Sequence, residues 1–158
     1  MSTTTALDQV RAQAIDLNTG YPRSAKVALA DYAIAARAVD KCRAELAGVQ
    51  GDYHYDCPLT KLFLDFAGLA AADLKAFIAT GATDDEIASW ITEHATKRER
   101  AEILRWSNEW REKKLSQLDD RLIAYMEDYM RDNCPAGAVH HVKVWFDIYD
   151  IEEKRLSV

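Results

Sequence analysis

Residues 53–58 of the chain, YHYDCP, gather side chains that commonly carry nucleophilic or redox chemistry. Pro58 suits the first position of an α-helix, which makes Cys57 the N-cap residue. The positive end of the helix dipole lies there and favours the thiolate over the thiol. His54 precedes Cys57 by three residues, close enough across a turn to hydrogen-bond the sulfur and activate it. The stretch therefore predicts a reactive cysteine with a histidine partner.

The other side chains of this stretch support that interpretation only in part. Tyr53 and Tyr55 add hydroxyl groups that can stabilise developing negative charge, whereas Asp56 opposes ionisation of the thiol. We take Cys57, His54 and Tyr55 as the candidate catalytic residues. The alternative is structural, because aromatic side chains often anchor the start of a helix to the core and a free cysteine is commonly buried.

A metal site is a third interpretation of the same residues. His54 and Cys57 have the spacing H-x-x-C, and Cys134, His140 or His141 would have to complete the ligand set. The paired-ligand spacing of zinc sites is missing. We therefore expect no metal, and we predict no cofactor.

The stretch NTGYPRS, residues 18–24, holds a second candidate site. Arg23 carries a planar guanidinium suited to a carboxylate or a phosphate. We favour a salt bridge between Arg23 and an acidic residue of the C-terminal tail. Asp147 and Asp150 lie in that tail at i and i+3, where they alternatively form an acid/base pair or remain solvated surface acids.

Helices must position these residues, because apolar side chains recur at helical spacing over most of the chain. Capping residues and glycine stops mark where each helix begins and ends. The predicted helices run from Ser24 to Gly48, from Pro58 to Gly68, through residues 74–81, from capping boxes at Thr83 with Glu86 and at Thr96 with Glu99, and from Ser116 to the stop NCPAG at 133–137.

The tail, residues 139–153, fits two patterns. Apolar residues between 142 and 149 alternate as in a strand, but they also fit helical spacing. A strand would have no partner elsewhere in the chain, so we favour a short helix or an extended segment packed on the bundle. The sequence thus predicts an all-α fold, a single-domain bundle of about six or seven helices over residues 1–158. We expect residues 1–16 to be a loosely attached N-terminal segment.

Composition and charge restrict the class of protein. The chain has 158 residues, of which 49% are hydrophobic and 29% charged, a profile typical of a globular protein. The formal net charge of −6 disfavours binding to nucleic acid or to an anionic membrane surface. No stretch approaches the ~20 apolar residues that span a bilayer, and the N-terminus lacks a signal-peptide pattern. Three cysteines without a disulfide pattern suit a reducing compartment, so we expect a cytoplasmic protein.

One segment departs from the acidic average. Residues 97–114 hold seven basic and four acidic side chains, and they include Trp106 and Trp110. We interpret this segment as an exposed helix face with i,i+4 ion pairs such as Glu109 with Lys113. RNA binding through the same face is a weaker alternative.

Three motifs, LNTGYPRS, YHYDCPL and WFDIYD, occur in this order along the chain. In these motifs and their separations the chain resembles the bacterial family of domain of unknown function 5069, from about Leu17 to about Asp150. The family name carries no activity with it. The resemblance implies that the family pattern includes Tyr21, Pro22, Arg23, Tyr53, His54, Tyr55, Cys57, Pro58, Trp145, Phe146 and Asp147.

The chain departs from that pattern at two positions. Asp56 stands where asparagine is expected, and Thr60 stands where an acidic residue is expected. An acidic side chain beside Cys57 can raise the pKa of the thiol, which weakens the thiolate interpretation for this chain.

Motifs rich in Tyr, His, Cys, Arg and Asp are typical of a binding pocket. We expect a small-molecule-binding α-helical protein, which is an enzyme on one interpretation. The alternative is a non-catalytic interaction or structural domain in which these residues only hold loops to the core. The expected partner is an unidentified small molecule, and a homo-oligomer is left open. The candidate ligand-binding residues are Tyr21, Arg23, Tyr53, Trp145 and Asp147.

Overall fold

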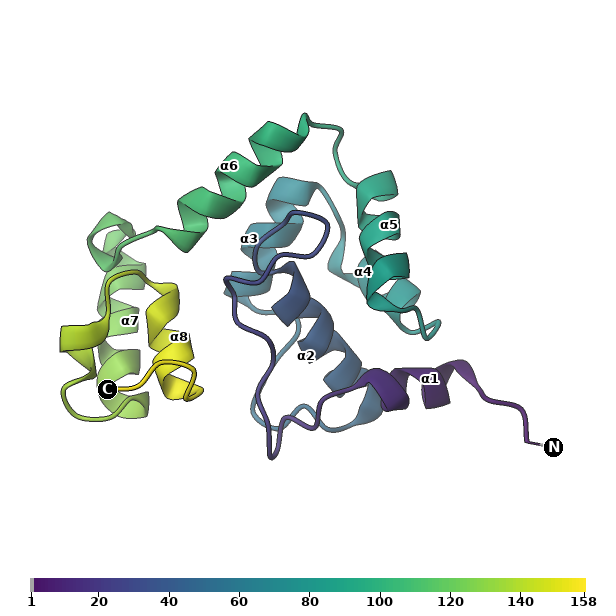
Figure 1. The fold of residues 1–158 in the computed structure, drawn as a ribbon, viewed down its shortest axis with the longest axis horizontal. Helices are drawn as coiled ribbons and strands as arrows, with labels where there is room; N and C mark the ends of the chain where they lie inside the picture. Colours follow the sequence, from purple (N-terminus) through teal and green to yellow (C-terminus); the bar gives the residue numbers. More distant parts are fainter. Residues whose placement is uncertain (1) are drawn as a thin grey trace.

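Helices are the regular elements of the computed structural model, which describes residues 2–158 (Figure 1). Eight α-helices within that range confirm the predicted all-α class, and their number is close to the predicted six or seven. They are α1 (Ala6–Gln13), α2 (Ala35–Ala47), α3 (Pro58–Ala67), α4 (Ala71–Ile78), α5 (Asp84–His94), α6 (Arg100–Arg111), α7 (Asp120–Asn133) and α8 (Phe146–Glu152), with 3₁₀ helices η1 (Leu115–Gln117) and η2 (Ala138–His141).

Several predicted helix ends are confirmed. Pro58 is the first residue of α3, and the Cys57 side chain caps that helix. Gly68 ends it in the left-handed conformation, with φ of 72°, which glycine adopts at little cost. Thr83 and Glu86 form the predicted capping box at the start of α5.

The predicted helix start at Ser24 is wrong, because residues 24–34 form turns and α2 begins only at Ala35. Tertiary hydrogen bonds hold the turns. The buried Oγ of Ser107 on α6 accepts from the Ala33 amide at 2.9 Å and donates to the Asp31 carbonyl at 2.7 Å. Asp31 has a φ of 70°, which is incompatible with a right-handed helix.

Replacing Ser107 with alanine should therefore destabilise the fold. The variant leaves the buried Ala33 amide without its acceptor, and such a loss costs about 1–3 kcal/mol. Chemical denaturation monitored by circular dichroism measures the free energy of unfolding. Ser116→Ala is the matched control, because Ser116 is exposed and should change that free energy by less than about 0.5 kcal/mol. Equal effects of the two variants would contradict the role assigned to Ser107.

Two further predicted helix starts are wrong. α6 begins at Arg100 with Glu99 as its N-cap and without a side-chain capping bond. Thr96, the predicted cap, instead donates its backbone amide to the Ala67 carbonyl at the end of α3, at 2.9 Å. Ser116 lies in η1, and the cap of α7 is Asp119, which accepts from the Leu122 amide.

Both ends of the chain form helices that pack on the rest. α1 lies within the N-terminal segment, has its own capping box at Thr5, and contacts α2. α8 lies within the tail, so of the two conformations that we favoured the short helix is confirmed. Phe146 and Ile148 of α8 are fully buried in the core.

Helix α2 lies at the centre of the molecule (Figure 1), and its residues from Ala35 to Ala44 are all buried. Alanine side chains let neighbouring segments approach α2 closely. Four charged residues lie among these alanines, and each meets a partner from another segment. These pairs are Arg37 with Glu153, Asp40 with Arg23, Lys41 with Cys57, and Arg43 with Asp84.

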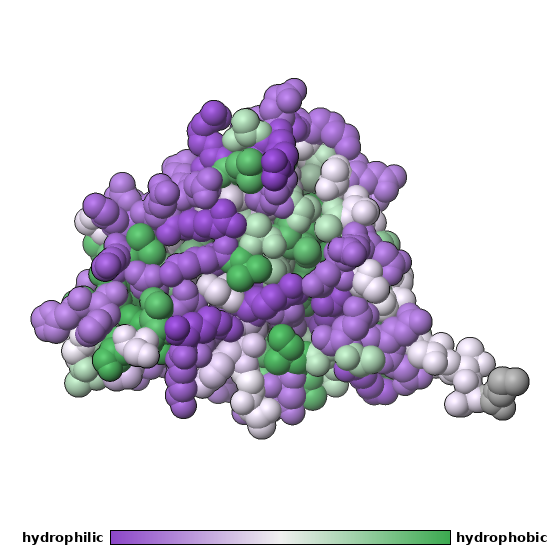
Figure 2. All heavy atoms as spheres, viewed as in Figure 1, coloured by the Kyte–Doolittle hydropathy of each residue, from purple (hydrophilic) through white to green (hydrophobic). Residues whose placement is uncertain are grey.

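The outer surface is mostly hydrophilic on the face shown in Figure 2, where hydrophobic side chains form small separate groups. None of the helices within residues 2–158 is both long enough and apolar enough to cross a bilayer.

Candidate functional site

A lysine and a cysteine meet where α2 passes the start of α3. Lys41 Nζ lies 2.9 Å from Cys57 Sγ. The sulfur also accepts from the backbone amide of Thr60 at 3.5 Å and contacts the Thr60 hydroxyl at 3.5 Å. Lys41 is only 4% exposed, whereas Cys57 is partly exposed, so a small molecule in solution can reach the sulfur more easily than the amine.

The two ionisable groups of the Lys41–Cys57 pair change each other's acidity. Burial acts to raise the pKa of Cys57, but the positive charge of Lys41 and the hydrogen bonds from Lys41 and Thr60 outweigh it and lower that pKa. Burial lowers the pKa of Lys41, and the negative charge of Cys57 only partly opposes this. The pair therefore favours a thiolate and also eases removal of the lysine proton.

A buried ion pair lies beside these two residues. Both guanidinium Nη atoms of Arg37 donate to Glu153, at 2.8 and 2.7 Å. The hydroxyl of Tyr53 donates to the same carboxylate at 2.7 Å. Burial acts to raise the pKa of Glu153, but Arg37 and Tyr53 together lower it, so the carboxylate is charged at neutral pH. Arg37 lies one helical turn before Lys41, so the two side chains share one face of α2. The ion pair fixes this face against the C-terminal segment that carries Glu153.

Two aromatic side chains of the C-terminal segment complete this region. The guanidinium of Arg37 lies over the ring of Tyr149, 5.4 Å from its centroid. Burial raises the pKa of Tyr149, and negative charge on Cys57 adds to that shift. Trp145 contacts Tyr149 and is buried, and its indole Nε1 has no hydrogen-bond partner within residues 2–158. Arg37 Nε is buried and unpartnered in the same range. These two N–H groups can donate hydrogen bonds to oxygen atoms of a ligand.

The two other residues predicted as catalytic lie apart from this chemistry. His54 is exposed, and within residues 2–158 the hydrogen-bond partners of the Cys57 sulfur are Lys41 and Thr60, not His54. Lys41 takes the position that we expected for the histidine. Tyr55 is buried, and its hydroxyl donates to the Ala71 carbonyl at 2.8 Å. It anchors the start of α3 to α4.

Arg23 meets different partners from those expected. The prediction that Arg23 forms a salt bridge with the C-terminal tail is wrong. Arg23 instead pairs with Asp40 on α2 at 2.9 Å and with Asp84 on α5 at 2.8 Å. Asp84 is the first residue of α5 and lies beside the central helix, within reach of the Arg23 side chain. It also pairs with Arg43 of α2. Tyr21, a predicted ligand-binding residue, is 39% exposed on the surface.

The acidic residues of the tail pair with a lysine. Lys26 Nζ lies 2.6 Å from Asp147 and 3.1 Å from Asp150. Asp147 also accepts from the backbone amides of Lys143 and Val144, which caps the turn before α8. Both carboxylates are buried, so they are not the solvated surface acids of one expectation.

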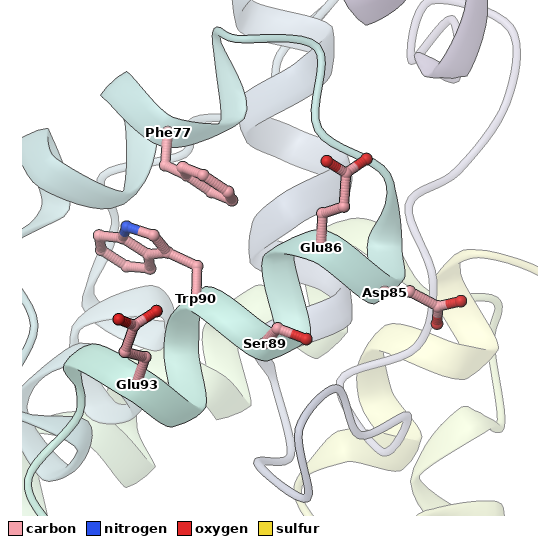
Figure 3. A pocket seen from close by; sticks show the side chains of 6 residues that line it. All are labelled: Phe77, Asp85, Glu86, Ser89, Trp90 and Glu93. Atoms are coloured by element: carbon pink, nitrogen blue, oxygen red, sulfur yellow. The ribbon is translucent and has the colours of Figure 1, made fainter.

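Surface hollows lie elsewhere on the molecule. One of about 350 Å³ lies between α4 and α5, where Phe77 faces the indole of Trp90 (Figure 3). The side chains of Asp85, Glu86 and Glu93 surround it along α5. Another of about 460 Å³ lies between α1 and the turn at residues 80–83. Neither hollow is lined by a residue that we predicted as catalytic or ligand-binding.

Sequence reasoning missed Lys41, Arg37 and Glu153. A signal for the first two is present, since Arg37 and Lys41 are like charges at i and i+4, a spacing that destabilises a helix unless partners compensate. They also lie among alanines rather than on a polar face. Glu153 carries no such signal, because it is one of two adjacent glutamates near an acidic tail.

No group of three or more His, Cys, Asp or Glu side chains in the described part of the chain, residues 2–158, is placed to hold a metal ion.

Comparison with known proteins identifies the family of the chain. The family model described as "Domain of unknown function (DUF5069)" matches residues 19–155, which is most of the chain. No curated protein matches the sequence.

Proposed function

The chain belongs to the DUF5069 family, and we propose that it binds a small electrophilic molecule and reacts with it through the thiolate of Cys57. The observation that carries the proposal is the 2.9 Å contact between Lys41 Nζ and Cys57 Sγ at the N-terminus of α3. A cationic partner and a helix N-terminus are the two surroundings that most lower the pKa of a cysteine. Both act on this one sulfur.

The chemistry follows from the two groups. The sulfur donates an electron pair to the electrophilic atom, and a new bond to sulfur forms. The bond to the leaving group breaks, and the Lys41 ammonium supplies the proton that the departing group needs. Arg37 Nε and Trp145 Nε1 are unpartnered donors in this region and suit a ligand with hydrogen-bond acceptors. We place this reaction in the reducing bacterial cytoplasm, which keeps Cys57 as a thiol.

The structural alternative is favoured for part of the candidate site. Arg23, Tyr55 and Asp147 each have protein partners for their polar groups, and each joins two segments of the fold. We therefore assign these residues to holding the fold and assign the reaction to the Lys41–Cys57 pair.

Thiol alkylation tests the proposal directly. With iodoacetamide at pH 7, Cys57 should react faster than Cys134 and much faster than Cys42, as followed by peptide mass spectrometry over time. Burial raises the pKa of Cys42 to about 12, and burial also raises the pKa of Cys134. Cys57 is the cysteine whose pKa is lowered, and it is partly exposed. If Cys134 reacts first, Cys57 is a packed N-cap and the proposed function fails.

A further inference from the structure

The contact between Lys41 and Cys57 is much shorter than the other contacts of sulfur in this protein. The Thr60 amide lies 3.5 Å from Cys57 Sγ, the Tyr149 hydroxyl lies 3.7 Å from the sulfur of Met126, and Cys134 Sγ lies 3.6 Å from the Ile148 carbonyl oxygen. The Lys41 contact is 2.9 Å. That distance is too long for a direct nitrogen–sulfur bond, and it is close to the span of one bridging atom.

From this geometry we propose that Lys41 and Cys57 form a covalent N–O–S bridge when the protein meets a peroxide. The bridge would block the thiol, and its reduction by a thiol reagent would release Cys57 again. It is therefore a reversible oxidative modification of the same site. The inference rests on the thiol reactivity of the proposed function, since the first step is attack by the Cys57 thiolate.

The fold holds both atoms in place for this reaction. Lys41 is on the buried central helix and is 4% exposed, so its amine cannot move far from the sulfur. Cys57 is held as the N-cap by the Thr60 amide. The other cysteines have no lysine within hydrogen-bond distance among the contacts of residues 2–158, so the modification is specific to Cys57.

The chemistry balances with two molecules of hydrogen peroxide. In the first step the thiolate attacks a peroxide oxygen, the O–O bond breaks, and the released hydroxide takes a proton from the Lys41 ammonium to become water. The products are a sulfenic acid and a neutral amine. In the second step the N–O bond forms, the sulfenic O–H and one amine N–H are lost, and the second peroxide takes up those two electrons and two protons to become two water molecules.

Mass spectrometry of the oxidised protein tests the inference. The reduced full-length protein is treated with hydrogen peroxide, alkylated, digested, and analysed with and without subsequent reduction by a thiol reagent. We expect the main oxidised form of Cys57 to gain one oxygen and lose two hydrogens. The peptide with Lys41 should be joined to the peptide with Cys57, and the thiol reagent should separate them.

Matched variants locate the bridge. Lys41→Arg keeps the positive charge but lacks the primary amine, so it should abolish the joined peptides. Lys75→Arg changes a partly exposed lysine that pairs with Glu45, and it should leave them unchanged. The wild-type measurement decides the question even if Lys41→Arg folds poorly.

The outcomes separate this inference from the proposed function. Sulfenic or sulfinic acid at Cys57 with an unmodified Lys41 overturns the bridge but leaves the reactive thiol intact. A joined product that lacks the extra oxygen also overturns the bridge, because the nitrogen and sulfur are then bonded directly. If Cys57 reacts with neither peroxide nor iodoacetamide, both the bridge and the proposed function are wrong.

Discussion

Replacing Glu153 with glutamine should lower the free energy of unfolding by about 3–5 kcal/mol, the usual cost of removing one partner from a buried ion pair. The variant leaves the guanidinium of Arg37, itself 4% exposed, without a counter-charge in the protein interior. Urea denaturation followed by circular dichroism measures the change. The neighbouring Glu152→Gln is the control, because burial raises the pKa of Glu152 and its charge is already disfavoured in the folded state.

The two glutamates should also differ in the sign of their pH dependence. The pKa of Glu153 is lowered in the folded protein, so its stabilising contribution is present above the unfolded value, about 4.3, and is lost as pH falls through the folded value. The pKa of Glu152 is raised, so its ionisation lowers stability as pH rises through the window above about 4.3. Glu153→Gln should flatten the acid limb of the stability curve. A Glu153→Gln variant with wild-type stability at pH 7 would show that the ion pair contributes nothing.

Replacing Lys41 with methionine should slow alkylation of Cys57 at pH 7 by roughly tenfold or more, since a tenfold loss of thiolate corresponds to one unit of pKa. Methionine keeps an unbranched apolar stem but removes the charge that lowers the pKa of Cys57. The rate should rise with pH in both proteins, and the variant should reach its plateau at a higher pH. The pH–rate profile therefore distinguishes a changed pKa from a change in access to the sulfur.

Two further variants make that measurement specific. Lys75→Met removes the charge of a lysine that pairs with Glu45, and it should leave the Cys57 rate within about twofold. His54→Ala tests the partner that the sequence suggested. His54 does not contact the sulfur, so its loss should slow the reaction less than the loss of Lys41 does. A larger effect of His54 would show that the histidine, rather than the lysine, activates Cys57.

The features of the fold that depend only on residues close together in the sequence could be predicted from it. Cys57 as the N-cap and Gly68 as the stop of α3 depend only on residues of that helix and its ends, and both are confirmed. The turns before α2 could not be predicted, because Ser107 on α6 holds Asp31 from a position 76 residues away in sequence. Hydrogen bonds of that kind leave no periodic pattern in either segment.

Of the Lys41–Cys57 pair, only the cysteine could be predicted from the sequence. The motif around Cys57 indicated the sulfur and its position at the helix start, because the relevant chemistry lies within a few residues. Its partner comes from another helix, and a buried lysine looks in sequence like any other lysine. Glu153 was still less predictable, since it lies 116 residues from Arg37 and does not differ in type from the glutamate beside it.

During synthesis of the chain, the Lys41–Cys57 pair is complete earlier than the Arg37–Glu153 pair. Only 16 residues separate Lys41 from Cys57, so that both emerge from a ribosome within seconds of each other at roughly 5–20 residues per second. Glu153 follows Arg37 by 116 residues, a delay on the order of ten seconds. During that interval the nascent chain has Lys41 and Cys57 but lacks the carboxylate that pairs with Arg37. Until the tail is made, burial of the Arg37 guanidinium would leave its charge unpaired, which disfavours enclosing that face of the central helix early.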